Sequence, residues 1–366
     1  MKLKLLILGL LCIVSIGFSQ TPTGYYNTAT GSGYTLKTQL KNIISNGHID
    51  QGYGALYDAY ETSDTDSFYE NDNSVLDMYS ENPNGADSYN YQHGSRNCGN
   101  YNSENDCYNR EHIFPQGFFN SQSPMRTDIH HVVPSDGYVN GRRSNYPFGE
   151  VATASWTSNN GSKVGSNTFG TFSGTVFEPI DEFKGDIARM LFYFATRYED
   201  EVTNSSWDNP NSSNSNPLNG SNNQVYEDWY LKLLYKWHIN DPVSNREIVR
   251  NNEAFKFQGN RNPFIDHPEF VSQIWGSILS TNNIALLTHV KIYPNPSTTK
   301  KITVEIPNGL EITSIKLYAI IGTKIYEAKN PTLYQQKITI TDLKSGVYLL
   351  KLNSNATNIT KKVIIN

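Results

Sequence analysis

Apolar and polar positions along the first part of the chain follow the spacing of α-helices. Residues 36–44 carry apolar side chains at every third or fourth position, with polar residues between them, so one face of the predicted helix is apolar. The segment 187–198 is apolar on nearly every side, which is typical of a helix buried in a core. Further helices are predicted at residues 53–60, 226–237 and 246–255.

The middle of the chain has a different pattern, in which short apolar runs end at proline. Residues 113–114 form one predicted strand ended by Pro115, and residues 130–133 form a second strand ended by Pro134. Ser135 is a suitable N-cap for a helix that follows directly. The predicted order is therefore strand, long loop, strand and helix. One more short strand is predicted upstream, at residues 74–80.

From residue 290 onward, apolar and polar residues alternate in short runs separated by turn residues. This alternation predicts strands that bury one face, spaced as in a small β-sandwich. The predicted strands are 302–306, 315–319, 324–327, 337–340, 347–352 and 360–364. The predicted fold class is α+β, with a mixed domain at residues 20–279, a linker at 280–289 and a small all-β sandwich at 290–366.

The N-terminus predicts that the chain is exported. Residues 1–19 contain two lysines, an apolar run and a small-residue exit, which is the pattern of a signal peptide. The run is too short for a retained membrane span, and no later segment approaches the ~18–20 apolar residues that a span needs. Once the signal is removed, Cys98 and Cys107 remain. A disulfide between them is expected in an exported chain, with two free thiols as the alternative.

The distribution of charge restricts where a nucleic acid could bind. The chain has a net charge of −5, to which residues 1–19 contribute +2 and residues 288–366 contribute +7, so residues 20–287 carry −14. Nucleic-acid binding calls for a basic surface, and any such surface must therefore be local. The candidate sources of positive charge are Arg142, Arg143, Arg246, Arg250 and Arg261.

The adjacent pair Glu111 and His112 is the strongest chemical signal. Neighbouring residues of a regular strand point to opposite faces, so the two can share a site only at a strand end or an irregular turn. Phosphodiester hydrolysis needs a cation on the phosphate, a base for water and stabilisation of the leaving oxygen. Glu111 and Asn140 offer the hard oxygens that suit Mg²⁺, and His112 is the predicted general base because imidazole titrates near neutral pH.

Several sequence words around this pair recur in the order found in a known family. The words are Asn109-Arg110-Glu111-His112, residues 128–134, residues 139–146 and residues 258–263. By these words, residues 25–277 resemble the endonuclease I family of secreted and periplasmic ββα-metal (His-Me finger) nucleases. The resemblance implies a ββα-metal core surrounded by helices, and extracellular cleavage of DNA, often RNA too, with little sequence preference.

The resemblance also implies roles for individual residues. His112 is implied as the general base, and Glu111 and Asn140 as ligands of one Mg²⁺ (or Mn²⁺ or Ca²⁺) per active site, with Asn145 as the neighbouring alternative to Asn140. A transition-state arginine that some relatives carry has no clear match here. Arg126, Arg142 or Arg143 can fill that role, and Arg143 is the candidate catalytic residue.

Each signal has a plainer structural explanation. A lone Glu–His pair is more often a surface salt bridge, and only the ordered words outweigh that explanation. His130 and His131 are expected to pack or to orient the site, and Asn260 and Arg261 to tie a loop or contact DNA. The rival hypothesis is a catalytically silent secreted protein on the same fold that binds nucleic acid or a surface. A zinc metalloprotease is disfavoured because the chain has no His-Glu-x-x-His spacing.

The tail carries a second resemblance. Residues 293–296 (Tyr-Pro-Asn-Pro), the later strands and the basic end at residues 361–366 are similar to the C-terminal sorting domain of type IX secretion cargo. The resemblance implies the type IX secretion machinery as a partner and a location outside the cell or at its surface. The alternative is an adhesive β-sandwich that stays attached and binds a surface.

Overall fold

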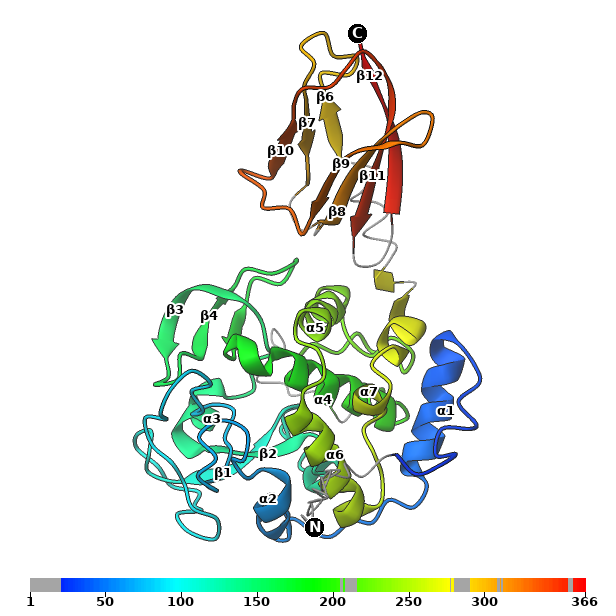
Figure 1. The fold of residues 1–366 in the computed structure, drawn as a ribbon. Coiled ribbons are helices and arrows are strands. Elements are labelled where there is room, and N and C mark those ends of the chain that lie inside the picture. The colour runs from blue at the N-terminus through cyan, green and yellow to red at the C-terminus, as the bar shows by residue number, and fades with distance from the viewer. Residues whose placement is uncertain are drawn as a thin grey trace, which may run out of the picture.

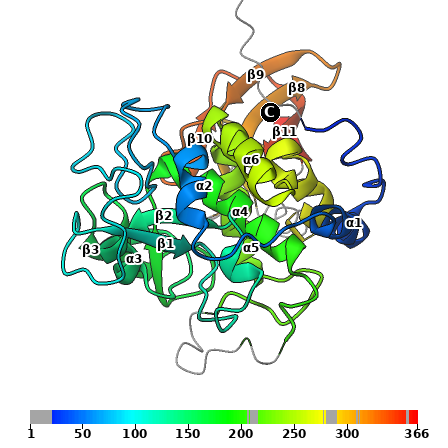
Figure 2. The same ribbon diagram turned by 90° about the horizontal axis from the view of Figure 1, so that it is seen from below.

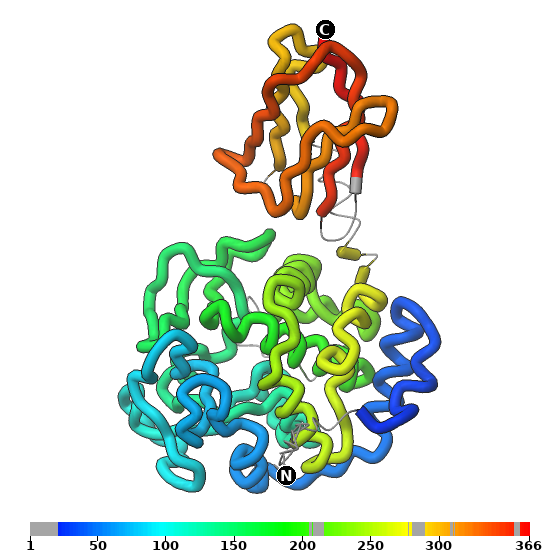
Figure 3. Tube along the Cα trace, in the orientation of Figure 1, coloured from blue at the N-terminus to red at the C-terminus, as the bar shows by residue number. Residues whose placement is uncertain are grey.

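The computed structural model describes residues 21–204, 207, 216–276, 278–279, 290–307, 310, 312–354 and 358–366. The predicted signal peptide and the predicted linker lie outside these described residues. The described chain forms a helical body and a β-sandwich (Figures 1 and 3), whose hydrophobic cores share no residue. Within the described part, every helix is too short or too polar to cross a membrane.

Helix α4 (Lys184–Arg197) is the centre of the helical body, as its apolar sequence predicts. Residues 185–196 are all buried, and α1, α5 and α7 contact this helix. Figures 1 and 2 place β1, β2 and α3 on one side of α4 and α1 on the other. Four other helices lie close to their predicted positions, α1 (Gly33–Ser45), α2 (Leu56–Ser63), α5 (Asp228–Asn240) and α6 (Asn245–Gln258), whereas no helix was predicted at α7 (Pro263–Asp266).

The predicted order of strand, loop, strand and helix is confirmed, although its boundaries differ. Strand β1 (Tyr108–His112) ends just before Ile113 and Phe114, the two residues predicted to form it. It pairs antiparallel with β2 (Val132–Asp136), and α3 (Gly137–Arg143) follows directly. Pro134 lies inside β2, opposite Arg110, rather than ending the strand. Proline is tolerated here because β1 and β2 form a two-stranded sheet, in which each strand has a free edge. Asp136 caps α3 in place of Ser135, since its carboxylate accepts the Tyr138 and Val139 amides at 2.8 and 2.9 Å.

The predicted strand at residues 74–80 is wrong. The carboxylate of Asp77 accepts the backbone amide of Tyr79 at 2.8 Å and the hydroxyl of Ser80 at 2.9 Å, which folds the segment into a turn. The same carboxylate accepts the backbone amide of Asp136 at 2.7 Å and so ties the turn to the start of α3. The residues of this segment are still buried, and burial alone does not distinguish a strand from a compact turn.

The other strands of the described residues form antiparallel sheets. In the helical body, β3 (Val151–Thr157), β4 (Lys163–Asn167) and β5 (Thr175–Glu178) form a sheet in that order. The tail has one sheet ordered β10-β7-β6 and another ordered β12-β11-β8-β9, which confirms the predicted sandwich. Its strands are β6 (Lys291–Tyr293), β7 (Ile302–Glu305), β8 (Ile312–Ala319), β9 (Lys324–Lys329), β10 (Lys337–Ile340), β11 (Gly346–Ser354) and β12 (Asn358–Ile365).

Buried ion pairs correct one prediction about charge. Arg246, Arg250 and Arg261 are at most 4% exposed and pair with Asp186, Asp64 and Asp266. These arginines hold α6 and its flanking loop to the rest of the body, so they do not provide a basic surface for nucleic acid. Asp186 also forms an ion pair with Arg189 one helical turn further along α4, with 3.8 Å between the charged atoms.

Candidate active site

Glu111 and His112 are the last two residues of β1, so the structure places the pair at a strand end, where the two can share a site. On the α3 side of β1, Asn140 donates a hydrogen bond from Nδ2 to Oδ1 of Asn109 at 2.7 Å. One helical turn further along α3, Nε of Arg143 lies 3.4 Å from Oε1 of Glu111. Residues three apart on a helix and two apart on a strand each share a face, so these contacts join one face of α3 to one face of β1.

The carboxylate of Glu111 is buried but compensated. The residue is 2% exposed, and its Oε1 accepts the hydroxyl of Tyr79 at 3.1 Å. Burial raises the pKa of Glu111 above its usual value, while the Arg143 cation and the Tyr79 hydroxyl oppose that rise. Because Tyr79 comes from the turn at residues 77–81, two distant segments fix the position of this carboxylate.

Arg143 is directed at the protein itself. It is 1% exposed, and its guanidinium donates to the carbonyl oxygens of His112 at 3.2 Å and Ile113 at 2.7 Å. Its Nε is near Glu111 without forming a hydrogen bond. These contacts make Arg143 a positioning residue for the end of β1, and its assignment as a catalytic residue stays a prediction.

His112 has a defined tautomer. Its Nε2 lies 3.1 Å from the backbone carbonyl oxygen of Arg126. A carbonyl oxygen can only accept, so Nε2 carries the hydrogen and Nδ1 keeps its lone pair. Burial lowers the pKa of His112 to about 3, and the neighbouring His131 acts in the same direction. The imidazole is therefore neutral at physiological pH and has one nitrogen able to accept a proton.

On the other side of β1, cationic side chains gather around one tyrosine. The guanidinium of Arg110 lies 3.5 Å from the ring centroid of Tyr53, and that of Arg126 lies 4.1 Å from the same centroid. The imidazole of His112 stacks on this ring with 6.0 Å between centroids. Both arginines are half-buried, and stacking on an aromatic face stabilises a guanidinium while its edge stays able to bind an anion.

A pocket of about 510 Å³ reaches both sides of β1, although neither Glu111 nor His112 is among its lining residues. Its lining includes residues from both, among them Tyr53, Arg110 and Gln116 from one and Asn109 and Asn140 from the other. The disulfide between Cys98 and Cys107, predicted from the sequence, is confirmed, and Cys98 lies in the pocket wall.

The other residues singled out in the sequence lie at the margins or in the core. Asn145 follows the end of α3 and lies beside Gly117, whereas Asn140 lines the pocket. His130 and His131 are buried, and each uses Nε2 to bond a backbone carbonyl, of Asn260 at 3.0 Å and of Met125 at 2.7 Å. These contacts agree with the packing role expected for both histidines.

The residues present fit a hard divalent cation. Asn140 uses its Nδ2 to bond Asn109, which leaves the carboxamide oxygen as its donor to a metal. Glu111 supplies a carboxylate on the same strand–helix interface. One carboxylate and one amide oxygen match the small protein ligand set that Mg²⁺ takes when it keeps several of its waters.

Comparison with known proteins agrees with this geometry. The family model described as Endonuclease I matches residues 32–269. The chain belongs to the endonuclease I family. The model described as a secretion system C-terminal sorting domain matches residues 291–366, so the resemblances found in the sequence are confirmed and the protein is exported.

Relatives of this endonuclease include two from Bacillus. The extracellular ribonuclease of Bacillus amyloliquefaciens is 35% identical over 257 residues, which cover 69% of this chain and 78% of the relative. The extracellular ribonuclease of Bacillus subtilis (strain 168) is 35% identical over 264 residues, covering 70% and 80%. Endonuclease-1 of Buchnera aphidicola subsp. Baizongia pistaciae is 27% identical over 141 residues, covering 38% and 46%. The family and these relatives together show that the protein is an extracellular nuclease.

Sequence reasoning missed two tyrosines of the endonuclease site. Tyr53 and Tyr79 come from segments far upstream of β1 and reach it only through the fold. The abundance of tyrosine in the chain gave no indication of which ones lie in the site. Arg110 stands within the family word Asn109-Arg110-Glu111-His112, so that word was the available signal for its position.

Proposed function

We propose that this endonuclease hydrolyses phosphodiester bonds of DNA with little sequence preference, using one Mg²⁺-type ion held by Glu111 and Asn140. His112 is the general base that takes a proton from the attacking water at Nδ1. The observation that supports this most strongly is the hydrogen bond between His112 Nε2 and the Arg126 carbonyl, because it leaves Nδ1 unprotonated and able to accept a proton.

The remaining residues position the reacting groups. When bound, the divalent ion supplies positive charge to the phosphate and to the leaving oxygen. Arg143 and Tyr79 hold the Glu111 carboxylate in place. Arg110 and Arg126, stacked on Tyr53, supply local positive charge for the nucleic-acid backbone. This local charge allows a domain with a net charge of −14 to bind a polyanion.

RNA is proposed as a second substrate. Both Bacillus relatives carry the name extracellular ribonuclease, and the proposed chemistry acts on the phosphate rather than on the sugar. An RNA transcript and a supercoiled plasmid offered under the same conditions would therefore both be cut, and degradation of only one would restrict the proposal to that substrate.

The domain boundaries are proposed together with this function. We propose that residues 1–19 are removed as a signal peptide, that residues 20–279 form the nuclease and that residues 280–289 are a linker. Residues 290–366 would then be the address read by the type IX secretion machinery. The match of the sorting-domain model to residues 291–366 and the separate core of the sandwich support these limits.

A plasmid-nicking assay with and without EDTA tests the proposed chemistry. We expect nicking that EDTA abolishes and added Mg²⁺ restores, and a His112→Ala variant that binds DNA but does not cut it. The rival hypothesis is a silent binding protein, which the negative charge of the body favours. Binding of DNA without any metal-dependent cleavage by the wild type would establish that rival instead.

A further inference from the structure

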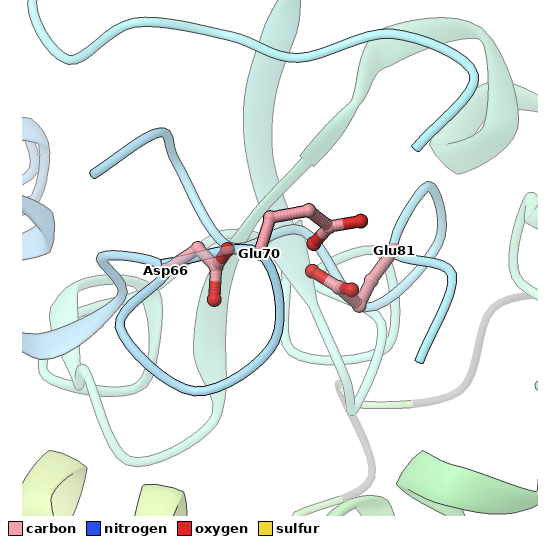
Figure 4. A group of neighbouring side chains, drawn as sticks. All are labelled: Asp66, Glu70 and Glu81. Atoms are coloured by element: carbon pink, nitrogen blue, oxygen red, sulfur yellow. The ribbon is translucent and has the colours of Figure 1, made fainter. Parts of the chain in front are cut away.

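A second group of carboxylates lies outside the active site and has no use in the proposed hydrolysis. Asp66, Glu70 and Glu81 each offer one oxygen, and no two of these oxygens are more than 4.8 Å apart (Figure 4). Asp66 and Glu70 belong to the loop after α2, whereas Glu81 belongs to the turn at residues 77–81. The group therefore joins two separate segments of the chain.

Two of the oxygens in this group are buried without a hydrogen-bond donor. Glu81 is only 1% exposed, and its Oε1 accepts no hydrogen bond from the described residues. Oε2 of Glu70 is also buried and accepts no hydrogen bond from the described residues. Oε1 of Glu70 accepts the backbone amide of Asp87 at 3.1 Å. Figure 4 shows the Glu70 and Glu81 carboxylates turned toward one another. A buried carboxylate that lacks both donor and counter-charge is strongly unfavourable.

The described residues place no cationic partner on these three carboxylates. Among the described residues, no lysine or arginine forms an ion pair with Asp66, Glu70 or Glu81. Burial and the neighbouring carboxylates of Asp87 and Glu70 raise the pKa of Glu81 to about 9. The arrangement thus lacks a positive charge at the point where the oxygens converge.

We propose that Asp66, Glu70 and Glu81 bind one Ca²⁺ ion that ties the loop after α2 to the turn at residues 77–81. All three donors are hard oxygens, without the nitrogen or sulfur ligands that zinc favours. Oxygens on opposite sides of a Ca²⁺ are about 4.6–5.2 Å apart, against about 4.0–4.2 Å for Mg²⁺. The three oxygens all lie within 4.8 Å of one another, so they can reach one Ca²⁺ without movement of the chain.

The rest of the loop is already arranged to present these ligands. Asp66 Oδ1 accepts the backbone amides of Phe68 and Tyr69 at 3.0 Å each, and its Oδ2 accepts that of Asn71 at 3.0 Å. Two residues before Glu81, Tyr79 donates its hydroxyl to the carboxylate of Glu111. A cation at Glu81 would thus also steady the tyrosine that positions the active site, although its binding does not depend on the nuclease mechanism.

Equilibrium dialysis with radioactive Ca²⁺ at pH 7.5 tests the proposal on the full chain. Glu61→Gln is the matched control, because Glu61 is an exposed acid on α2 and the substitution removes the same charge. We expect Glu81→Gln to bind one Ca²⁺ fewer than Glu61→Gln. Any ion held at Glu111 contributes equally to both variants, so the difference is independent of the active-site proposal. Equal binding by the two variants would overturn the Ca²⁺ site.

Thermal unfolding gives a second, independent result, with Glu70→Gln as a further variant. At a Ca²⁺ concentration about 100 times the dissociation constant, the site should raise the Tm of wild type and Glu61→Gln by about 5 to 10 °C more than that of Glu81→Gln or Glu70→Gln. In Ca²⁺-free buffer this order should disappear, because none of the four proteins then holds an ion at this site. A proton shared by Glu70 and Glu81 instead of a cation would give all four proteins the same Ca²⁺ response, which would contradict the proposal.

Discussion

Two regions of the molecule are built from buried charges but satisfy those charges to different degrees. One is the end of β1. The other is an ion-paired base formed by Asp186, Arg189, Arg246 and Glu247. In the ion-paired base, Arg189 donates to both oxygens of Glu247 at 2.5 and 2.8 Å, and Arg246 pairs with Asp186. At the end of β1, the Nε atoms of Arg110, Arg126 and Arg143 have no hydrogen-bond acceptor among the described residues.

This difference separates stability from function. A saturated network has nothing left to offer a ligand, and removing one member leaves its partner buried and unpaired. Buried donors that the fold leaves unsatisfied call for an explanation in a native structure, and they often mark a functional site. Substitutions in the ion-paired base should therefore change the free energy of unfolding, and those at the end of β1 should change the reaction.

The largest effect is expected for His112→Ala. General-base catalysis contributes about 10²–10⁴-fold to a rate, so plasmid cleavage should fall by that factor while DNA binding in a gel-shift assay persists. His238→Ala is the matched control, because His238 is also a buried histidine, 6% exposed, and lies on α5 away from β1. Equal loss of turnover in the two variants would remove the assignment of His112 as the base.

The next largest effect is expected for Arg189→Met, which should change stability rather than turnover. Removing one partner of a buried ion pair costs about 3–5 kcal/mol, and Glu247 would lose both hydrogen bonds that Arg189 donates to it. Urea unfolding should show this loss, while turnover per folded molecule stays close to wild type. A fall in turnover as large as the fall in stability would break the proposed separation of the two regions.

The pKa of His238 predicts that the stability of the fold depends on pH. Burial, with a further contribution from Arg189, lowers the pKa of His238 in the folded state to about 4, below the ordinary value of about 6.5. The unfolded chain therefore binds a proton first as the pH falls, so this histidine supports folding above pH ~6.5 and loses that contribution as the pH drops toward ~4.

Replacing His238 with glutamine removes that titration. The unfolding free energy of wild type relative to His238→Gln should decrease by about 1.4 kcal/mol per pH unit across this window, to a total of about 3 kcal/mol. Urea unfolding at pH 7.5, 5.5 and 4.5 measures the difference. A difference that stays constant with pH would show that the folded protein accepts the proton on His238 without penalty.

The smallest effect is expected for Tyr79→Phe. This change removes only the hydroxyl that donates to Glu111, and loss of a residue that orients a metal ligand typically weakens metal affinity about 10-fold or more. The Mg²⁺ concentration for half-maximal cleavage should therefore rise about 10-fold. Tyr226→Phe is the control, since its buried hydroxyl donates to the Leu191 carbonyl instead. Identical Mg²⁺ curves for both variants would exclude a role for Tyr79 in holding Glu111.

The sequence predicted best what depends on local periodicity. The run at residues 187–198 is apolar all round, and the helix it forms is buried. The alternating runs after residue 290 form the sandwich strands for the same reason. The strand predicted at residues 74–80 is absent because the side chain of Asp77 accepts the backbone amide of Tyr79, which competes with strand pairing.

Site residues joined by tertiary contacts were less accessible to the sequence. Glu111 and His112 were found because they are adjacent and part of an ordered set of words. Tyr53 reaches His112 from 59 residues away along the chain, and no local pattern marks such a contact. The buried arginines misled the charge argument because a sequence does not show which cations the fold neutralises.

The described core residues of the tail are separate from those of the helical body, and this has a consequence for maturation. A protease that cut the chain between residues 279 and 290 would leave the described core residues of both parts in place. We expect the trimmed enzyme to keep the melting temperature and turnover of its precursor, a point that calorimetry before and after limited digestion would decide. The sorting domain and the nuclease domain would then be independent units that evolution can combine or separate.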